Sequence, residues 1–548
     1  MPSVKCRITS ASSWQGFRHV NFVGDTQMTY AQKLATRFNR RAACLMSAAA
    51  LVLAGQQCEA QALLSSGGSA SVPVSSITVA EFAAGRVFQR DKGTYSSFND
   101  GTKAVRFTGT YTGGTPLTIT AAVKGVAYPC TIISAANGIW AAAATIPNGD
   151  DYTATISCSP GTATASQSNR WGVGILIALF GDSIMQQMWY TTAGAAIGDA
   201  HARWTVGTGW WLTSQTGKGE RSADNGLNHL ATAIRSHFMA ASRGNTTPVG
   251  FIAGAISSTT STDWQTGHSA WTSWTNLIAN SDIGGDYEMV LCNIGATDTD
   301  IDQTPGSSPT FATKYANIYK QVQSQTGRNT SQVKLGSALT GVLTGSGTSD
   351  ANCDFVRTGE KEQALGAGCF WLGSNTDHTH GLDGIHYSAE LYERLARRYA
   401  VAVCKQLGIL TFGSDGPKIS SANWSVGTNQ LVANITHLSC GTALLDGSGS
   451  RTGTGLVGFV IKVNESTVTP ASTAFSGNMI VFTMPKDRPM EDKITICYCG
   501  GANPWGWTNR GDSIAHLVFD NCASYVGDSV GFPLQPTPGG LASPMTVT

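Results

Sequence analysis

Residues 174–184 read GILIALFGDSI, an apolar run that ends in a Gly-Asp-Ser turn. A short, continuous apolar run bounded by glycine is typical of a strand that is buried on both faces of a parallel sheet. Such a strand delivers the hydroxyl of Ser183 to the carboxyl edge of the sheet, where open α/β sheets bind their ligands. Gly181 permits the tight turn, and a helix beginning just after Ser183 would direct free backbone amides toward developing negative charge. The stretch therefore predicts an α/β domain in which Ser183 is a candidate nucleophile.

The same tripeptide occurs again at Gly511-Asp512-Ser513, so it is weak evidence by itself. No apolar strand precedes this second copy, and no Asp-x-x-His sequence follows it. We therefore interpret residues 511–513 as a loop.

The chain on both sides of the apolar run divides into segments of different pattern. Between residues 171 and 412, apolar strand-like runs alternate with helix-like stretches, at 174–180, 227–239, 249–256, 288–294, 311–325 and 333–339. That alternation predicts a parallel sheet with helices on both faces. The flanking residues 63–170 and 413–548 contain short β-rich runs broken by Gly, Asn and Ser, which predicts a β-sandwich domain on each side.

Residues 1–62 are expected to comprise an upstream extension and a secretory signal. Arg40-Arg41, the apolar run 42–55 and Ala60-Gln61-Ala62 match the basic start, short apolar middle and Ala-x-Ala exit of such signals. The mature chain would begin near Leu63 and be secreted or periplasmic. The apolar run is shorter than the roughly 20 residues of a membrane-spanning helix, and no later segment is longer, so we predict no membrane span.

Charge and cysteine content narrow the class of protein further. The 36 basic and 35 acidic residues nearly cancel, which argues against nucleic acid as a partner and favours a neutral or weakly charged substrate. Of 13 cysteines, three precede residue 63, and the even remainder favours disulfides in an oxidising compartment. Cys130 with Cys158 and Cys353 with Cys369 are plausible pairs by position. Cys497 and Cys499 lack further ligands at metal-binding spacing.

The segment Asp383-Gly-Ile-His386 supplies the partners that a serine nucleophile needs. It precedes the helix-like stretch 389–404, for which Ser388 is a natural N-cap. Three residues apart on a turn, the carboxylate can hold the imidazole in the tautomer that takes a proton from Ser183.

Two alternatives use neighbouring residues. Asp377-His378-Thr379-His380 also contains Asp-x-x-His, but it lies in a polar stretch that leads into no helix. A metal site formed by His378, His380 and His386 lacks a helical i, i+4 pair and a carboxylate at suitable spacing. We therefore predict no metal and no cofactor.

The blocks Gly181-Asp182-Ser183 and Asp383-Gly-Ile-His386 resemble the first and last motifs of SGNH (GDSL-like) hydrolases, over residues 172–407. The resemblance implies a flavodoxin-like three-layer α/β/α domain with a Ser183, His386, Asp383 triad. In that family, two intermediate motifs supply a glycine amide and an asparagine side chain to the oxyanion hole.

This chain departs from both intermediate motifs. Ser257 and Ser258 stand where glycines are expected, although either backbone amide can still donate alongside that of Ser183. Thr297 stands where asparagine is expected, and a hydroxyl has a shorter reach than an amide. Asn293 would compensate only if strand alternation brought it to the same edge.

The flanking regions and the tryptophans bear on the substrate. Residues 85–91, 137–140 and 149–156 resemble the N-terminal β-domain of sialate-O-acetylesterase-like enzymes. Most tryptophans are core residues, so we select only Trp189 and Trp264, which are close to the motifs, as candidates for stacking on a sugar. Trp505-Gly-Trp507 is either a carbohydrate platform or part of a β-domain core.

The sequence thus predicts a metal-independent serine esterase that removes O-acetyl groups from a polysaccharide or glycan. An O-acyltransferase acting on an exported polysaccharide would use the same triad. A catalytically silent glycan-binding protein would account for the missing asparagine. A lipase is disfavoured because there is no long apolar lid. The oligomeric state is left open.

Overall fold

The computed structural model describes most of the chain after residue 70. The described residues are 71–91, 101–190, 202–205, 209–212, 226–241, 247–280, 286–327, 333–343, 348–378, 384–387, 389–425, 427–486, 493–503, 514–526, 529–537 and 541–542. Residues 72–548 form one compact unit. Predicted features outside the described residues are the secretory signal, Asp383, His380, Ser388, Trp505 to Trp507 and Gly511 to Ser513.

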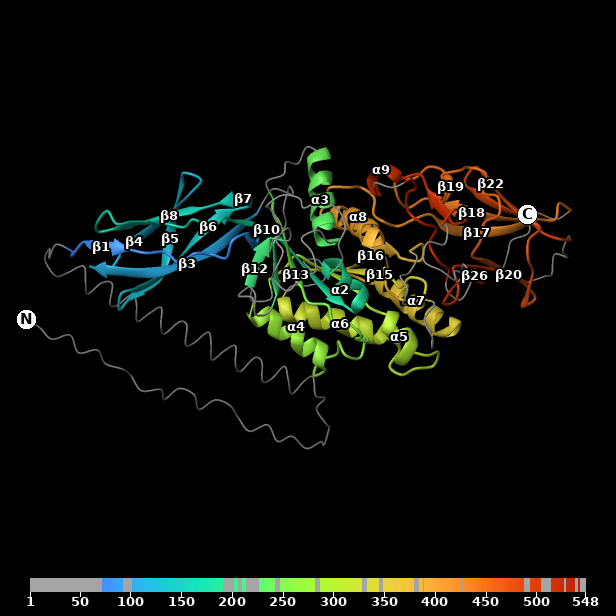
Figure 1. The fold of residues 1–548 in the computed structure, drawn as a ribbon, viewed down its shortest axis with the longest axis horizontal. Helices are drawn as coiled ribbons and strands as arrows, with labels where there is room; N and C mark the ends of the chain where they lie inside the picture. Colours follow the sequence, from blue (N-terminus) through green and yellow to red (C-terminus); the bar gives the residue numbers. More distant parts are fainter. Residues whose placement is uncertain are drawn as a thin grey trace, which may run out of the picture. The chain divides into compact units, whose positions relative to one another are not determined.

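The N-terminal region forms an antiparallel sheet of seven strands (Figure 1). In spatial order these are β1 (Val74–Ile77), β3 (Thr102–Gly113), β6 (Ile139–Pro147), β5 (Val126–Ala136), β4 (Thr118–Val123), β8 (Ala154–Ser159) and β9 (Thr164–Ser166). Side chains alternate along the strands, so Val105 and Phe107 are fully buried while Arg106 between them is exposed. The sheet curls, since the amide of Val74 on β1 donates to the carbonyl of Pro160, beyond β8, at 2.7 Å.

A second sheet occupies the middle of the chain. In spatial order its strands are β12 (Gly209–Leu212), β11 (Ala202–Thr205), β13 (Val249–Ala253), β10 (Trp171–Gly181), β14 (Met289–Asn293), β15 (Lys334–Leu339) and β16 (Cys369–Ser374). All neighbours are parallel except β11 and β12. The predicted parallel sheet is therefore confirmed.

Strand β10 belongs to both regions. Its first residues pair with β2 (Arg86–Gln89) and with β7 (Gly149–Tyr152), whereas its second half pairs with β13 and β14. Trp171, the first residue of β10, is buried and makes edge contacts with the rings of Phe82, Phe88 and Tyr152. One strand thus joins the N-terminal strands to the central sheet.

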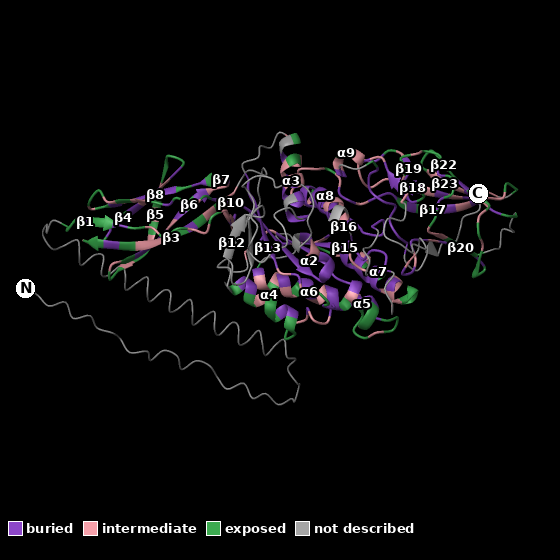
Figure 2. Cartoon of the chain, in the orientation of Figure 1, coloured by how far each residue is buried: buried purple, intermediate pink, exposed green. Residues whose placement is uncertain are grey.

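Helices pack against both faces of the central sheet. Alternate residues of β10 belong to two separate apolar cores, one on each face of the sheet. Ile177 lies in one core and Ala178 in the other, and each core includes residues from its own set of helices. The first set is α2 (Ser183–Tyr190), α3 (Gly226–Ala240) and α8 (Ala389–Gln406), and the second is α4 (Ser269–Asn280) and α6 (Phe311–Thr326). Figure 2 shows buried residues along the central strands, as expected when both faces are covered. Among the described helices, none is long and apolar enough to cross a bilayer.

The C-terminal region is again antiparallel β. Its strand groups are β17 (Lys418–Ser425), β18 (Gln430–Thr436), β23 (Met479–Thr483) and β22 (Ser472–Ser476); β19 (Leu444–Asp446) with β25 (Val518–Asp520); and β21 (Ser466–Thr467), β20 (Phe459–Val463), β24 (Ile494–Tyr498) and β26 (Leu541–Ala542). A short helix, α9 (Ala523–Val526), follows β25. Most of these strands contribute residues to one apolar core, whereas the two residues of β21 are exposed.

A buried arginine joins this region to the central sheet. Arg357 on α7 (Asp350–Ala364) is fully buried, and its guanidinium donates to four backbone carbonyls. Two acceptors, Thr340 and Gly341, follow β15, and two, Cys499 and Gly501, follow β24. One guanidinium therefore satisfies carbonyls from segments that lie far apart in the sequence.

The predicted cysteine pairs are wrong. Cys130 and Cys158 are free, because both lie opposite Ile119 from the two neighbouring strands of β4. Two strand spacings amount to about 9–10 Å, which is beyond the reach of a disulfide. Cys353 and Cys369 are also free and pack toward different cores. The disulfide that the structure contains joins Cys440 to Cys522.

Candidate active site

Ser183 lies where the apolar run predicted. Strand β10 ends at Gly181, α2 begins at Ser183, and the serine is 5% exposed. Gly181 has φ of 141°, and a Cβ at this position would lie 2.0 Å from the carbonyl oxygen of Asn293 on the adjacent strand. Only glycine allows the chain to turn so close to β14. The predicted strand, turn and helix are therefore confirmed.

Asp182 ties the serine turn to a second turn. Its buried carboxylate accepts hydrogen bonds from the amides of Ile184 at 3.0 Å, Gly295 at 3.3 Å and Ala296 at 3.1 Å. Burial raises the pKa of Asp182 to about 6, although these three amides and the charge of His386 act in the opposite direction. The start of α5 (Ala296–Ile301) is thus held beside the residue that precedes Ser183.

His386 lies in the described segment 384–387 and is partly buried. The charge of His386 acts to lower the pKa of Asp182. The structure therefore places the predicted base close enough to influence the turn that carries Ser183. The next residue, Tyr387, is buried, and its ring packs against His378 and Tyr392 at 5.1 and 5.5 Å between centroids. This aromatic contact anchors the segment that carries His386.

Of the alternative Asp-x-x-His pair, the structure describes Asp377, which lies in a buried ion pair. The carboxylate of Asp377 accepts from both terminal nitrogens of Arg398 on α8 at 2.7 and 2.6 Å, and both side chains are 1% exposed. Burial favours a raised pKa for Asp377, but the charges of Arg398 and His378 hold it well below the usual range. Nδ1 of His378 lies 3.1 Å from the same carboxylate. Because this carboxylate is committed to Arg398, the geometry indicates a structural ion pair.

The predicted oxyanion donors other than Ser183 lie in two segments beside its turn. Ser257 and Ser258 are exposed on the turn after β13, and Ser258 has φ of 58°, the left-handed region that favours glycine. The amide of Ile256 donates to the carbonyl of Gly181 at 3.0 Å, which holds this turn beside the serine turn. Thr297 is half-buried at the second position of α5.

Asn293 does not compensate for the missing asparagine. It is 1% exposed, and its side-chain amide donates to the hydroxyl of Tyr399 on α8 at 3.2 Å. The amide is therefore engaged in the core. The predicted side-chain donor to the oxyanion is therefore Thr297, which lies on α5.

The structure corrects the assignment of Trp264 to sugar binding. Trp264 is fully buried, its ring packs against Phe180 at 5.0 Å, and its indole nitrogen donates to the hydroxyl of Thr259 at 3.0 Å. A ring enclosed on all sides offers no face to a sugar. The side chain of Trp189 lies outside the described residues.

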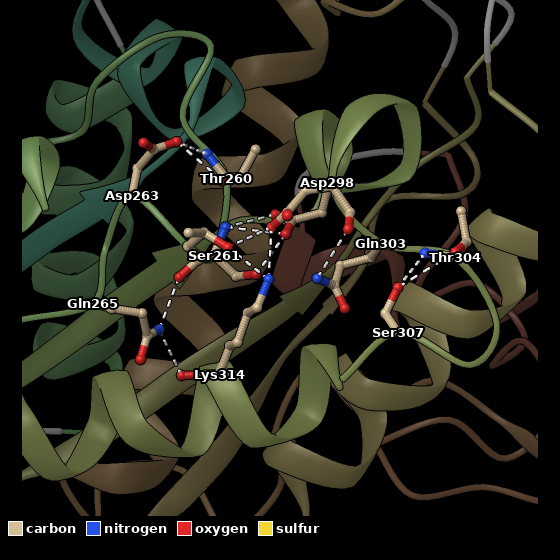
Figure 3. A network of polar contacts seen from close by, with 11 residues as sticks. Thr260, Ser261, Asp263, Gln265, Asp298, Gln303, Thr304, Ser307 and Lys314 are labelled. Atoms are coloured by element: carbon tan, nitrogen blue, oxygen red, sulfur yellow. Dashed lines mark hydrogen bonds and ion pairs between the residues drawn. The ribbon is translucent and has the colours of Figure 1, made fainter. Parts of the chain in front are cut away.

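Sequence reasoning missed the network behind the two donor turns (Figure 3). Asp298 on α5 accepts from the amide and hydroxyl of Ser261, and all these groups are fully buried. Beside it, Asp302 accepts from Thr262 at 2.7 Å and from the ammonium of Lys314 at 2.9 Å. The signal available in the sequence was the position of Asp298 directly after Thr297.

The described residues contain no group of three or more His, Cys, Asp or Glu side chains that could hold a metal ion. Asp182, Asp298 and Glu360 are buried carboxylates, and each has separate hydrogen-bond donors. Glu360 accepts from the amide and hydroxyl of Thr340, and burial raises its pKa to about 8. Burial likewise raises the pKa of Asp298 to about 7.

Comparison with known proteins shows a likeness of fold. No protein-family model and no curated protein matches the chain. Among solved structures, a carbohydrate acetylesterase from Xanthomonas citri superposes with a TM-score of 0.53 at 15% identity, over 83% of this chain and 97% of that one. A carbohydrate acetylesterase from Sinorhizobium meliloti (TM-score 0.28, 15% identity) and an aryl esterase from M. smegmatis (TM-score 0.28, 14% identity) each match 42% of this chain, over 98% and 100% of their own. The predicted resemblance to carbohydrate esterases is confirmed as a shared fold.

Proposed function

We propose that the chain is a serine esterase of the SGNH type that removes O-acetyl groups from a polysaccharide or glycan. The observation that carries the proposal is the convergence on Asp182: the nucleophile turn, the start of α5 and the charge of His386 all meet at this residue. Ser183 attacks the ester carbonyl, and His386 takes its proton and then returns it to the leaving alcohol. Asp383 orients the imidazole, and water releases the acyl group.

The developing oxyanion is held by the amide of Ser183, by an amide of Ser257 or Ser258, and by the hydroxyl of Thr297. The tie between Ile256 and Gly181 supports this role for the first two turns, and the tie between Asp182 and Ala296 supports it for α5. Trp189, six residues after Ser183 on α2, is retained as a sugar-stacking residue.

The proposal also includes the division of the chain into domains. We assign residues 171–412 to a three-layer α/β/α catalytic domain, between β-sandwich domains at 63–170 and 413–548. Helix cores on the two faces of β10 support the layered arrangement. The signal within residues 1–62 would direct the mature protein to the periplasm or the exterior.

The test compares hydrolysis of p-nitrophenyl acetate and of acetylated polysaccharides by the mature protein and three variants. We expect Ser183→Ala to lose roughly a thousand-fold or more in kcat and Asp383→Asn a similar factor. Ser513→Ala is the matched control, since it changes the same tripeptide in its second copy and should keep the parent rate. Equal rates for the parent and Ser183→Ala would contradict the esterase.

A second candidate, a catalytically silent glycan-binding protein, is favoured by the use of Asn293 in the core and by threonine at position 297. It predicts that the parent releases no acetate, even with a sugar acceptor present, and that Ser183→Ala binds acetylated glycans as the parent does. Transfer of acetate to an added sugar acceptor would instead indicate the O-acyltransferase.

A further inference from the structure

A buried hydrogen-bonded tie connects the two turns that carry the proposed oxyanion donors. The carboxylate of Asp298 accepts from the amide of Ser261 at 2.9 and 3.0 Å and from its hydroxyl at 2.5 Å. Both residues are fully buried. A buried hydrogen-bond network whose groups are all satisfied makes its members rigid.

The tie is placed next to the donors on each side. Ser261 comes three residues after Ser258, on the turn that follows β13, and Asp298 comes directly after Thr297 on α5. An oxyanion donor must lie within roughly 2.7–3.1 Å of the developing charge. The Asp298 to Ser261 bond therefore fixes the separation of two donors that come from different elements.

An outer contact holds the same two segments but is more open to solvent. Lys314 and Thr262 both bond to the carboxylate of Asp302, whose side chain is 24% exposed. Exposed ion pairs contribute little to rigidity. The inner tie is the one that is both buried and adjacent to the donors.

Asp298 is also electrostatically costly where it lies. Burial and the charges of Asp302 and Asp182 all disfavour its ionised form, and the hydrogen bonds from Ser261 oppose them. A carboxylate close to a developing oxyanion gives no electrostatic stabilisation, so its contribution must come from geometry. Nothing in the proposed triad uses it.

We propose that Asp298 is a positioning residue that sets the distance between the amides of Ser257 and Ser258 and the hydroxyl of Thr297. This inference rests on the proposed esterase function. It predicts that loss of the tie weakens binding of the transition state more than binding of the substrate.

The experiment measures kcat and KM for p-nitrophenyl acetate, and the rate of inactivation by diethyl p-nitrophenyl phosphate, in the full mature chain. We expect Asp298→Asn to lower kcat and the inactivation rate together by about ten- to a hundred-fold, less than removal of a donor, with KM within about twofold of the parent. Ser261→Ala should lower both rates by a smaller factor. The double variant should be no slower than Asp298→Asn alone, because both changes break one tie.

Glu288→Gln is the matched control for a purely structural effect. Glu288 is a partly buried carboxylate that accepts from Gln89 and Arg90 just before β14, at the opposite end of the sheet from Ser183. It should lower the unfolding midpoint and leave kcat and inactivation unchanged.

The outcomes separate the two proposals. A folded Asp298→Asn with the parent's kcat and inactivation rate overturns the inference while the esterase stands. If Asp298→Asn does not fold, an unchanged kcat in Ser261→Ala has the same meaning. A parent that neither hydrolyses the ester nor is labelled at Ser183 by the phosphate ester overturns the proposed function, and this inference with it.

Discussion

The carbonyl oxygen of Asn293 lies 2.0 Å from the point that a Cβ on residue 181 would occupy, where Gly181 is present. Two features of the fold meet at this close approach: the parallel pairing of β10 with β14, and the turn at the carboxyl end of β10 after which Ser183 begins its helix.

We predict that Gly181→Ala abolishes activity and strongly reduces folded yield. The variant combines a backbone clash with a φ of 141°, and neither the strand nor the turn can move without breaking the sheet. Gly267→Ala is the control: φ is 92° there, but no atom lies within 4 Å of the added Cβ. It should cost only about 1–2 kcal/mol of unfolding free energy. Urea unfolding measures the stability of the two variants, and ester hydrolysis measures their activity. Comparable losses of stability and activity in both variants would refute the steric explanation.

A second prediction concerns the buried pair of Asp377 and Arg398. Arg398→Met removes both guanidinium bonds to the buried carboxylate of Asp377 and leaves it His378 and the more distant Arg394, so we expect a loss of about 3–5 kcal/mol in urea unfolding. The double variant Asp377→Asn with Arg398→Met should recover part of that loss. Under conditions where it is folded, Asp377→Asn should retain ester hydrolysis, in contrast to Asp383→Asn. A thousand-fold loss in folded Asp377→Asn would instead favour the alternative Asp-His pair.

The buried carboxylates predict how stability depends on pH. Burial raises the pKa of Asp182, Asp298 and Glu360 to about 6, 7 and 8, whereas unfolded carboxyls titrate near about 4. Between these values the native state binds more protons than the unfolded state, so their stabilising contribution is complete below about pH 4 and is lost as pH rises toward 8. Asp377, with its lowered pKa, acts in the opposite sense and only at acidic pH.

Unfolding midpoints at pH 5 to 8 test this dependence. Glu360→Gln should flatten the decline, because the amide does not ionise, while Glu465→Gln, an exposed carboxylate paired with Lys493, should keep the parent slope. Identical slopes in all three proteins would show that Glu360 does not titrate in this range.

The fourth prediction concerns Arg357. Arg357→Met removes the donors to four buried carbonyls from two regions, and unpaired buried acceptors cost about 1–3 kcal/mol each. We expect the C-terminal region to unfold in a separate, earlier transition and to become sensitive to limited proteolysis. Arg397→Met, on the i,i+4 pair with Glu393, should leave a single transition. A single transition in Arg357→Met as well would mean that other contacts hold the region.

Local features were predictable from the sequence, and features that depend on distant segments were not. The apolar run before Gly181 determined the strand, the turn and the helix, because burial, glycine and the helix start act within a few residues. The burial of Trp264 and the free state of Cys130 depend on neighbours that arrive from other strands and helices. The Cys440 to Cys522 disulfide spans 82 positions, and its pairing has no signature in residue spacing.

At the candidate site, too, local features were predictable and contacts with distant segments were not. The positions of Ser183 and His386 follow from motifs, whereas the contacts of Asp298 and Asn293 depend on which face of each element meets the core. Asn293 lies at the end of β14, only four residues before Thr297. Its side chain nevertheless points to the face of the sheet that α8 covers, where its amide donates to Tyr399. Sequence spacing alone could not separate these two roles.

The shared strand β10 has a consequence for aggregation. Its first four residues, Trp171 to Gly174, pair on one side with β2, and β7 also pairs with this end of the strand. A chain shortened to begin at Trp171 would expose this apolar stretch with unsatisfied amide and carbonyl groups, and such edges recruit strands from other molecules. The isolated α/β part should therefore self-associate, and a chain that begins before β2 should remain dispersed.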